Sequence, residues 1–346
     1  MESAKIRVLV IDDSLFMRTL ISGMLNSDPE IEVIDTAKDG EEAIKKLSKI
    51  RPDCITLDLA MPGWDGLTTL EHIMAEYPTP VIILSAHSKK DADITIKCLN
   101  AGAVGFVLKP SGELSLDIET VKHELLEEVK AASKVNLARI KLLFKKKPKR
   151  PRRKLAALNK IIVIGASTGG PQTLETILYS LPVNLPVPVI IVQHVPTRFF
   201  TESLAEHLNK TSDLEVKVTE DGEVLRPGKA YLAPAGFQTT LKMCDRDVIV
   251  SLAKAEPNSL SPSVDITMES VAKIYDGNTI GIILSGMGRD GQEGMRVIKE
   301  AGGKTIVQDE SSLIFGMPKA VIDAGVADKV LPVGEIAETM VELVEK

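Results

Sequence analysis

The sequence predicts an α/β protein of two domains, each with a mostly parallel sheet covered by helices. The chain has 346 residues, more than one ordinary hydrophobic core accommodates. Along both halves, short apolar runs alternate with amphipathic stretches, as strands and crossover helices do. Between the halves, residues 145–154 read KKKPKRPRRK, eight basic residues and two prolines. Because proline opposes helix formation and like charges repel, we interpret this segment as a solvated tether.

The composition excludes several classes of protein. Aromatic residues make up only 3% of the chain and the net charge is −6, which disfavours a surface for nucleic acid or anionic membrane. The scattered cysteines Cys54, Cys98 and Cys244 fit neither a disulfide framework nor a metal site. The N-terminus does not resemble a signal peptide, and no apolar run is long enough for a membrane span. We expect a cytoplasmic protein, working as a monomer, without nucleic acid and without membrane insertion.

Polar residues end four of the five strands expected in the N-terminal half. Asp12 and Asp13 follow the first strand, Asp58 ends the third, Ser85 the fourth and Lys109 the fifth. The expected strands read IRVLVID, IEVIDTA, CITLDL, PVIILSA and GFVLKP. In parallel sheets, ligands bind beyond the carboxyl ends of the strands, so these side chains should converge.

Three neighbouring carboxylates repel one another, so this cluster predicts a divalent cation. Oxygen ligands alone favour Mg²⁺. One carboxylate could then attack a phosphoryl donor and become an acyl phosphate, whose oxygens a lysine and a hydroxyl would bind. The simpler alternative is that the aspartates only cap helices, as Asp12 could for a helix that begins near Ser14.

In the C-terminal half, the expected strands include IIVIGA, VPVIIVQ, TIGIILSG and KTIVQD, and GASTG follows the first of them. This pattern fits G-x-S-x-G, a sharp strand-to-helix turn that exposes a serine, here Ser167. A phosphate-binding loop is disfavoured because no GK[ST] follows, and the dinucleotide fingerprint G-x-G-x-x-G is absent.

A nucleophilic serine needs a base and a group that orients the base. Of the five histidines, His194 alone directly follows a strand of this half. The preferred carboxylate is Asp290, in a glycine-rich turn after a strand, and Asp309 is the alternative. The glycines would let the backbone approach a substrate and direct amide N–H groups at an oxyanion. The order Ser167, His194, Asp290 differs from that of α/β-hydrolases.

The N-terminal half resembles the receiver domain of response regulators over residues 5–125. The matching segments are VLVIDDS, LDLAMPGWDG, ILSA and GAVGFVLKP. The resemblance implies a (βα)5 receiver fold phosphorylated on Asp58 with Mg²⁺ as cofactor. It further implies that Asp13, Asp58 and the carbonyl of Ala60 bind Mg²⁺, that Asp12 assists through water, and that Ser85 and Phe106 form the switch pair with Lys109 nearby. Trp64 stands where the family often has methionine.

The C-terminal half resembles the catalytic domain of chemotaxis protein-glutamate methylesterases over residues 158–344. The matching segments are IIVIGASTGGPQTL, VIIVQHVPTRFFTESLAEHL, YLAPAG, PSVDITMESVA, GIILSGMGRDGQEGM and QDESSLIFGMPKAV. The resemblance implies a doubly wound hydrolase domain without a cofactor. Its implied site residues are the triad Ser167, His194 and Asp290, with Thr168 in the substrate site and the N–H of Met287 in the oxyanion hole. This chain departs from the family pattern at Gln238, Leu260, Ser261 and Arg289.

We therefore expect a receiver domain at 1–125, a helical and basic proline-rich linker at 126–157, and a catalytic domain at 158–346. The resemblance implies demethylation of glutamate methyl esters on chemotaxis receptors and deamidation of receptor glutamines. A chemotaxis histidine kinase would phosphorylate the receiver, which gates the active site until then. The alternatives are a response regulator whose output is binding, with the tether touching nucleic acid, and an esterase for small molecules.

Overall fold

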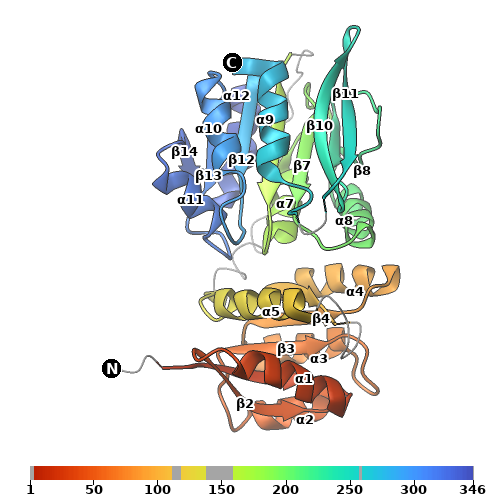
Figure 1. Ribbon diagram of the computed structural model, residues 1–346, viewed down its shortest axis with the longest axis vertical. Coiled ribbons are helices and arrows are strands. Elements are labelled where there is room, and N and C mark those ends of the chain that lie inside the picture. Colours follow the sequence, from red (N-terminus) through yellow and green to blue (C-terminus); the bar gives the residue numbers. More distant parts are fainter. Residues whose placement is uncertain (1–3, 111–117, 138–158, 257–258, 346) are drawn as a thin grey trace. The chain divides into compact units, whose positions relative to one another are not determined.

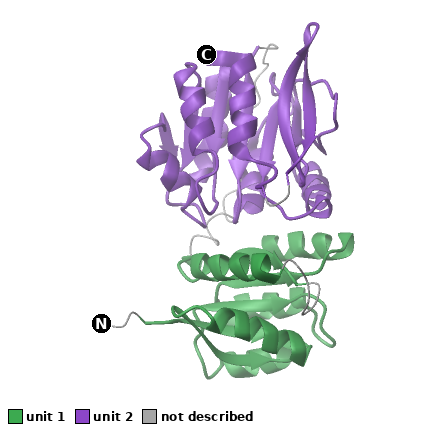
Figure 2. Ribbon diagram, viewed as in Figure 1, with its two compact units in different colours: residues 1–140 green, residues 141–346 purple. Residues whose placement is uncertain are grey.

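The chain forms two compact units, residues 1–140 and 141–346 (Figure 2). The computed structural model describes residues 4–110, 118–137, 159–256 and 259–345. Most of the expected linker, including the basic tether at 145–154, lies outside the described residues. No described helix combines the length and the hydropathy that crossing a bilayer requires.

The N-terminal unit is a five-stranded parallel sheet in the order β2-β1-β3-β4-β5 (Figure 1). Its strands are β1 (Ile6–Ile11), β2 (Ile31–Ala37), β3 (Cys54–Asp58), β4 (Val81–Ser85) and β5 (Gly105–Leu108). Its helices are α1 (Leu15–Asn26), α2 (Gly40–Leu47), α3 (Gly66–Glu76), α4 (Lys89–Asn100) and α5 (Ile118–Ala132). The expected (βα)5 fold is confirmed, and α5 continues seven residues beyond the expected boundary at 125.

Side-chain caps start four of these helices soon after a strand or turn. Ser14 accepts the N–H of Met17 at the start of α1, and Asp39, Asp65 and Ser88 do the same for α2, α3 and α4. Such caps satisfy backbone N–H groups that lack a partner in the first turn. Asp12 is therefore not the cap of α1, although its carboxylate accepts the N–H of Ser14 at 2.9 Å.

The C-terminal unit has a seven-stranded parallel sheet in the order β14-β13-β12-β6-β7-β9-β8. Its strands are β6 (Ile161–Ala166), β7 (Val189–Gln193), β8 (Glu215–Val218), β9 (Lys229–Leu232), β12 (Thr279–Ile283), β13 (Lys304–Gln308) and β14 (Lys329–Leu331). Its α-helices are α7 (Gly170–Ser180), α8 (Arg198–Thr211), α9 (Val264–Tyr275), α10 (Gln292–Glu300), α11 (Met317–Asp323) and α12 (Val333–Glu345), and the short 3₁₀-helix η1 (Asp276–Asn278) follows α9.

This sheet is doubly wound about its central strand β6. From β6 the chain moves to β7 on one side, whereas from β12 it moves to β13 on the other. Since parallel crossovers are right-handed, α7 and α10 cover opposite faces of the sheet. The reversal of strand order falls between β6 and β12, which is where such sheets open a crevice for ligands. The expected doubly wound fold is confirmed.

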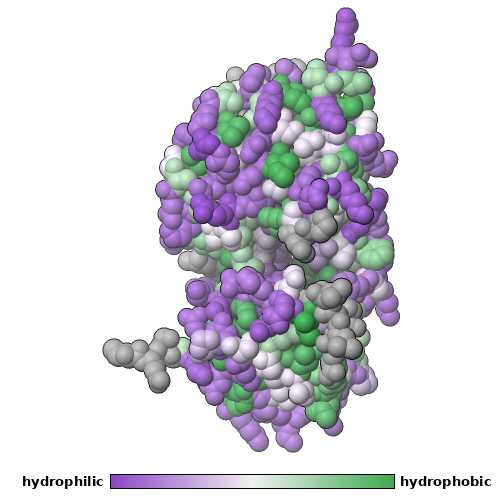
Figure 3. Space-filling view, viewed as in Figure 1, coloured by the Kyte–Doolittle hydropathy of each residue, from purple (hydrophilic) through white to green (hydrophobic). Residues whose placement is uncertain are grey.

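A β-hairpin, β10 (Phe237–Cys244) and β11 (Asp247–Lys254), stands outside the main sheet. Its tip is hydrophilic (Figure 3). The hairpin packs on α9, where Thr267 donates its hydroxyl to the carbonyl of Thr239 at 2.8 Å and Ser270 accepts the N–H of Leu241 at 2.7 Å. It thereby holds the N-terminal part of α9, which bears on the site described below.

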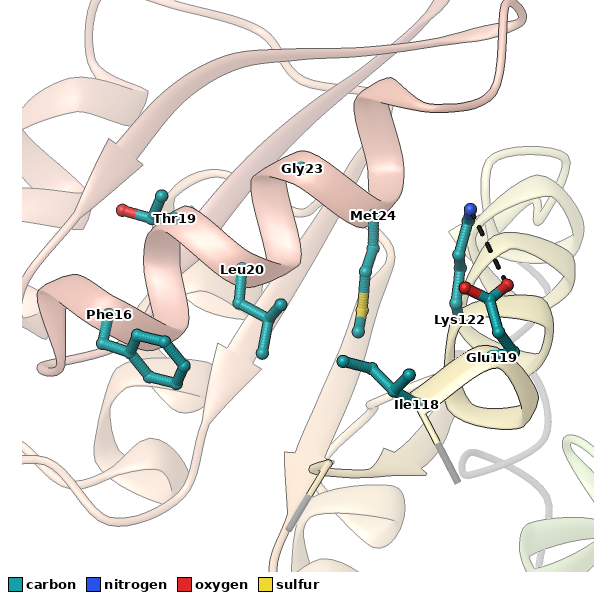
Figure 4. A pocket seen from close by; sticks show the side chains of 8 residues that line it. All are labelled: Phe16, Thr19, Leu20, Gly23, Met24, Ile118, Glu119 and Lys122. Atoms are coloured by element: carbon teal, nitrogen blue, oxygen red, sulfur yellow. Dashed lines mark ion pairs between the residues drawn. The ribbon is translucent and has the colours of Figure 1, made fainter. Parts of the chain in front are cut away.

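A groove of about 420 Å³ lies between α1 and α5 in the N-terminal unit (Figure 4). Phe16, Leu20, Met24 and Ile118 supply much of its wall, and an ion pair of Lys122 and Glu119 lies at its edge. No histidine, cysteine or serine lines it. None of the predicted catalytic residues lines this groove, and these residues lie instead near the ends of strands.

Candidate active site

Ser167 lies on the tight turn between β6 and α7, and the end of β12 holds this turn in place. The N–H of Ser167 donates to the carbonyl of Ser285 at 3.0 Å. In return, the hydroxyl of Ser285 donates to the carbonyl of Thr168 at 2.7 Å. Gly169 has φ of +75°, and a Cβ there would lie 2.6 Å from the Ser285 hydroxyl. The turn therefore requires glycine, and the nucleophile candidate has a defined backbone position.

Gln193, the last residue of β7, connects this turn to His194. Its amide nitrogen donates to the carbonyl of Ser167 at 2.9 Å and to the carbonyl of His194 at 3.0 Å. The side chain is buried. A Cβ on Gly170 would overlap its Oε1, so glycine is needed for this approach. One buried amide thus fixes the backbones that carry the hydroxyl and the imidazole.

His194 and Asp290 form a hydrogen bond of 2.8 Å between Nε2 and Oδ2. Their side chains are 15% and 11% exposed, so the pair is largely shielded from water. Ser167 and His194 follow directly after the paired residues Ala166 and Gln193 of adjacent strands. Because Nε2 faces Asp290, Nδ1 is the nitrogen left to receive a proton from Ser167.

Within the described residues, no hydrogen bond joins the Ser167 hydroxyl to His194. Such contacts are often long before a substrate binds and tighten in the reacting complex. The backbones are nevertheless close, since the N–H of His194 donates to the carbonyl of Ala166 at 3.0 Å. The two side chains therefore leave neighbouring points of one sheet edge.

The start of α9 binds the carboxylate of Asp290. The N–H groups of Val264 and Asp265 donate to it at 2.7 and 3.0 Å, and the hydroxyl of Ser263 donates at 3.1 Å. Burial alone would raise the pKa of Asp290, but the hydrogen bonds from His194 and from this backbone outweigh it and hold that pKa below its usual range. Asp290 is therefore ionised at neutral pH and suited to stabilise an imidazolium.

The backbone after β12 presents an amide to the same place. A Cβ on Gly286 would lie 2.8 Å from the Cβ of Ser167, so this loop passes directly beside the nucleophile candidate. The carbonyl of Gly286 accepts the N–H groups of Gly316 and Met317 at 3.1 and 2.8 Å. The next N–H, that of Met287, has no acceptor among the described residues. This N–H can donate to an oxyanion that forms on a substrate of Ser167.

The predicted carboxylate cluster of the N-terminal unit lies at the ends of β1, β3 and β5. Lys109 contacts Asp12 at 2.6 Å and Asp58 at 2.8 Å. Asp12 and Asp58 are buried, whereas Asp13 is exposed. Burial raises the pKa of Asp12, although the hydrogen bond from Lys109 acts in the opposite direction. The cluster thus combines buried negative charge with an open side.

The donor set of this cluster fits Mg²⁺. The carboxylate oxygens of Asp12, Asp13 and Asp58 lie within 4.8 Å of one another. An ion that binds oxygens at about 2.1 Å spans about 4.2 Å between opposite ligands, so small side-chain rotations suffice. The N–H of Ala60 donates to Asp58 Oδ1 at 3.2 Å, which orients that carboxylate at the strand end.

The expected switch residues lie near this cluster. Ser85 ends β4 and is buried, and its hydroxyl accepts that of Thr95 from α4 at 2.9 Å. Phe106 lies on the adjacent strand β5, where it pairs with Ile83, and it is half-buried. Ser85 is thus a buried hydroxyl at the end of a strand next to the one that carries Asp58.

Comparison with known proteins identifies both units. Residues 162–340 match the CheB methylesterase family, and residues 8–119 match the response regulator receiver domain. A protein-glutamate methylesterase/protein-glutamine glutaminase of Thermotoga maritima is 45% identical over 98% of each chain. The chain belongs to the CheB methylesterase family. The prediction that a receiver domain is followed by a methylesterase domain is confirmed.

Other members of the CheB methylesterase family agree with this assignment. A protein of the same name from Halalkalibacterium halodurans is 44% identical over 99% of each chain. The Thermotoga maritima CheB methylesterase catalytic domain, known from a crystal structure, is 46% identical in sequence and superposes with a TM-score of 0.52. The matched region covers 55% of this chain and 100% of the Thermotoga maritima chain. The C-terminal unit is therefore the methylesterase domain of this family member, and the N-terminal unit is its receiver domain.

The structure brings the predicted strand-end residues of the methylesterase domain to one edge. The alternative carboxylate, Asp309, instead accepts the N–H of Ser311 at 2.8 Å within its own turn. Thr168 follows Ser167 and is half-buried. Sequence reasoning missed Gln193 and Ser285, although both are polar residues at the end of a strand, the same signal that identified His194.

The four departures from the family pattern surround the site without entering the hydrogen bonds of His194. Gln238 donates to the carbonyl of Leu260 at 2.8 Å and accepts the N–H of Ser263 at 3.0 Å. It therefore supports the segment that carries the Ser263 hydroxyl to Asp290. Ser261 lies in this same segment, and Leu260 is exposed. Arg289 is exposed and donates to Gln292 at 3.2 Å.

Proposed function

We propose that this chain hydrolyses methyl esters of glutamate side chains on chemotaxis receptors and deamidates receptor glutamines, and that phosphorylation of Asp58 activates it. The observation that carries the proposal is the 2.8 Å hydrogen bond between His194 and Asp290 beside the turn of Ser167. Relatives that are 40–45% identical over nearly the whole chain bear the name of both activities. The proposed catalytic residues are Ser167, His194 and Asp290.

The reaction begins when the Ser167 hydroxyl oxygen attacks the ester carbonyl and His194 Nδ1 takes its proton. The imidazolium keeps its Nε2–H on Asp290, whose ionised carboxylate stabilises the new positive charge. The carbonyl oxygen becomes an oxyanion that accepts the N–H of Met287. Electrostatic stabilisation of this kind by a fixed backbone donor contributes several kcal/mol, about 2.7–4, to lowering the barrier.

The tetrahedral intermediate collapses when the bond to the methoxy group breaks and His194 donates its proton to the methoxy oxygen, which leaves as methanol. The product is a glutamyl ester of Ser167. Water, deprotonated by the same imidazole, then attacks this ester and releases glutamate and free Ser167. For a glutamine substrate, the leaving group is ammonia instead of methanol. Thr168, next to Ser167, is proposed to contact the substrate.

In the receiver domain, Asp58 is proposed to accept the phosphoryl group from a chemotaxis histidine kinase. Asp13, Asp58 and the carbonyl of Ala60 would hold Mg²⁺, with Asp12 assisting through water. The ion would neutralise negative charge on the carboxylates and the phosphoryl oxygens. Lys109, now paired with Asp12 and Asp58, can move its charge to a phosphoryl oxygen. The Ser85 hydroxyl and the ring of Phe106 would follow this change as the switch pair.

We further propose the division into a receiver domain at 1–125, a linker at 126–157 and a catalytic domain at 158–346, with the receiver gating the active site. The partners would be methyl-accepting chemotaxis receptors and their kinase, at the cytoplasmic side of the cell. All three catalytic residues belong to one chain, so a monomer suffices. The mechanism requires no cofactor in the catalytic domain and no nucleic acid.

The proposal is tested by replacing the nucleophile. Ser167→Ala should lower the release of methanol from methylated receptors by about 10⁴-fold or more, as loss of a catalytic serine does. A fluorophosphonate should label the wild-type chain at residue 167 alone, as mapped by peptide mass.

Ser180→Ala provides the matched control. Ser180 is a buried serine on the same helix that follows the turn, and its hydroxyl donates only to the carbonyl of Thr176 at 2.7 Å. This variant should keep its activity and its label. Near-normal methanol release by Ser167→Ala would overturn the assignment.

A further inference from the structure

The N-terminal ends of α9 and α10 each bind a carboxylate that lies at the N-terminal end of the other helix. Asp290, two residues before α10, accepts the N–H groups of Val264 and Asp265 at the start of α9. Asp265, in the first turn of α9, accepts the N–H groups of Gly291 and Gly294 at 2.9 and 2.7 Å. Each helix start therefore provides donors for a carboxylate attached to the other. Helix N-termini favour negative charge, so both contacts are of the stabilising kind.

Gly291 and Gly294 make these reciprocal hydrogen bonds possible, because they let the N-terminal ends of α9 and α10 approach closely. Gly291 has φ of +97°, a conformation that other residues rarely adopt. A Cβ on Gly294 would lie 2.5 Å from the Cβ of Met268 and 3.2 Å from the Cα of Asp265. The turn that carries Asp290 is therefore packed directly against α9, and Asp265 closes it with two hydrogen bonds.

The position of Asp290 relative to His194 depends on this turn. Asp290 contacts His194 through Oδ2 and α9 through both carboxylate oxygens, so a small shift of its backbone changes all these bonds together. Among the described residues, Asp265 has no hydrogen bond or ion pair with His194 or Ser167. Two carboxylates this close repel, and burial together with the charge of Asp290 raises the pKa of Asp265. Its hydrogen bonds to the turn are what offsets this repulsion.

We infer that Asp265 is a positioning residue for the reaction, because it fixes the turn that holds Asp290 against His194. The inference rests on the proposed function. Without an acceptor at residue 265, the N–H groups of Gly291 and Gly294 lose their partner and the turn relaxes away from α9. A displacement of about 1 Å in such a supporting group is enough to lower a rate about 100-fold. The effect belongs to kcat, since Asp265 does not contact the substrate.

Three variants of the full chain test the positioning role of Asp265. The assays contain Mg²⁺ and acetyl phosphate, so that the receiver domain can be phosphorylated. Asp265→Ala should lower kcat for methanol release about 10- to 100-fold and leave KM within about twofold. Asp265→Asn should restore kcat to within about threefold of wild type, because the amide oxygen still accepts both N–H groups. The amide nitrogen can also donate to Asp290, which removes the repulsion.

Asp328→Ala is the matched control. Asp328 also accepts a backbone N–H, that of Thr305 at 3.0 Å, and pairs with Lys299, but it lies at β13 and β14 and does not contact Asp290. The Asp328→Ala variant should have a lower melting temperature, and kcat of the folded protein should be unchanged. If Asp265→Ala does not fold, Asp265→Ser replaces it, with the same loss expected because the shorter side chain cannot reach both N–H groups.

Labelling by a fluorophosphonate separates this inference from the proposed function. Absence of label on wild-type Ser167 would end the proposed function itself. Labelling of wild type and of Asp265→Ala at equal rates, with equal kcat, would end only the role of Asp265. Failure of Asp265→Asn to restore kcat would also count against it, because the hydrogen bonds would then not be the cause. Slower labelling of Asp265→Ala than of Asp265→Asn supports the inference.

Discussion

At the scale of single residues, Gly286 determines how closely the loop after β12 approaches Ser167, the proposed nucleophile. A Cβ at this position would lie 2.8 Å from the Cβ of Ser167 and 3.1 Å from its N, and would overlap the sulfur of Met317. Real Cβ atoms do not tolerate such contacts, so Gly286→Ala must shift Ser167 or the N–H of Met287. We expect kcat for methanol release to fall about 100-fold, the effect of roughly 1 Å of misplacement.

Gly334→Ala is the control for this substitution. A Cβ on Gly334 would meet nothing within 4 Å, and the residue lies in the first turn of α12. Alanine there should leave kcat unchanged and slightly raise the melting temperature, since it lowers the entropy of the unfolded chain. Equal kcat for Gly286→Ala and Gly334→Ala would show that the close approach of this loop to Ser167 does not matter for the proposed reaction.

Some residues of the candidate active site could be predicted from the sequence and others could not. Ser167, His194 and Asp290 were predicted because the carboxyl ends of parallel strands meet at one edge of a sheet. The choice of Nε2 as the partner of Asp290 was not predictable, since it depends on the ring orientation. The support by Ser263 and Asp265 was missed because it arises where two helix starts meet, and no spacing along the chain encodes that meeting.

At the scale of elements, the receiver site is formed by residues at several strand ends. The proposed binding of Mg²⁺ to this site can be measured through one residue. Trp64 is the single tryptophan of the chain and lies between β3 and α3, six residues after Asp58. Its ring stacks on His72 with centroids 4.1 Å apart. Mg²⁺ should change the tryptophan emission in a saturable way, because the ion orders the loop that starts at Asp58.

Asp13→Asn should weaken this Mg²⁺ titration by roughly tenfold or more, since it removes one charged oxygen ligand at constant size. Asp53→Asn is its control, because Asp53 lies at the opposite end of β3 and accepts the N–H of Arg7 at 2.8 Å. Both titrations are made on the full chain at one fixed pH. Identical curves for Asp13→Asn and wild type would remove Asp13 from the proposed metal ligands.

Most elements were predicted where apolar runs are buried. Strands β1, β3, β4 and β5 of the receiver domain and the strands β6, β7, β12 and β13 of the catalytic domain follow such runs. Strand β2 was also predicted, although only Ile31 and Ala37 of it are buried. The hairpin of β10 and β11 was not among the predicted strands, because its residues are mostly half-buried or exposed and give a weak pattern. Its stability comes from packing on α9, which is a tertiary contact. The short strand β14 was not predicted either, because its residues are exposed or half-buried and give a weak pattern.

At the scale of the whole molecule, the two domains are covalently joined, and the gating that we propose would need only a weak contact between them. Placing two domains on one chain gives an effective concentration of about 1 mM between them. A domain contact with an intrinsic Kd of about 10 μM would then be closed about 100 to 1. Phosphorylation of Asp58 need weaken that contact by only about 2.7 kcal/mol to open half of the molecules. A charge change at one carboxylate can supply a difference of this size.

Removal of the receiver domain tests this gating. The fragment 141–346 should release methanol up to about 100-fold faster than the unphosphorylated full chain, because nothing then competes with the substrate. The fragment is expected to fold, since it contains its own core and resembles a Thermotoga maritima catalytic domain crystallised by itself. The full chain carrying Asp58→Asn should stay slow with acetyl phosphate, whereas wild type should accelerate. If the fragment is no faster than the unphosphorylated full chain, the receiver does not cover the active site, and phosphorylation must act in another way.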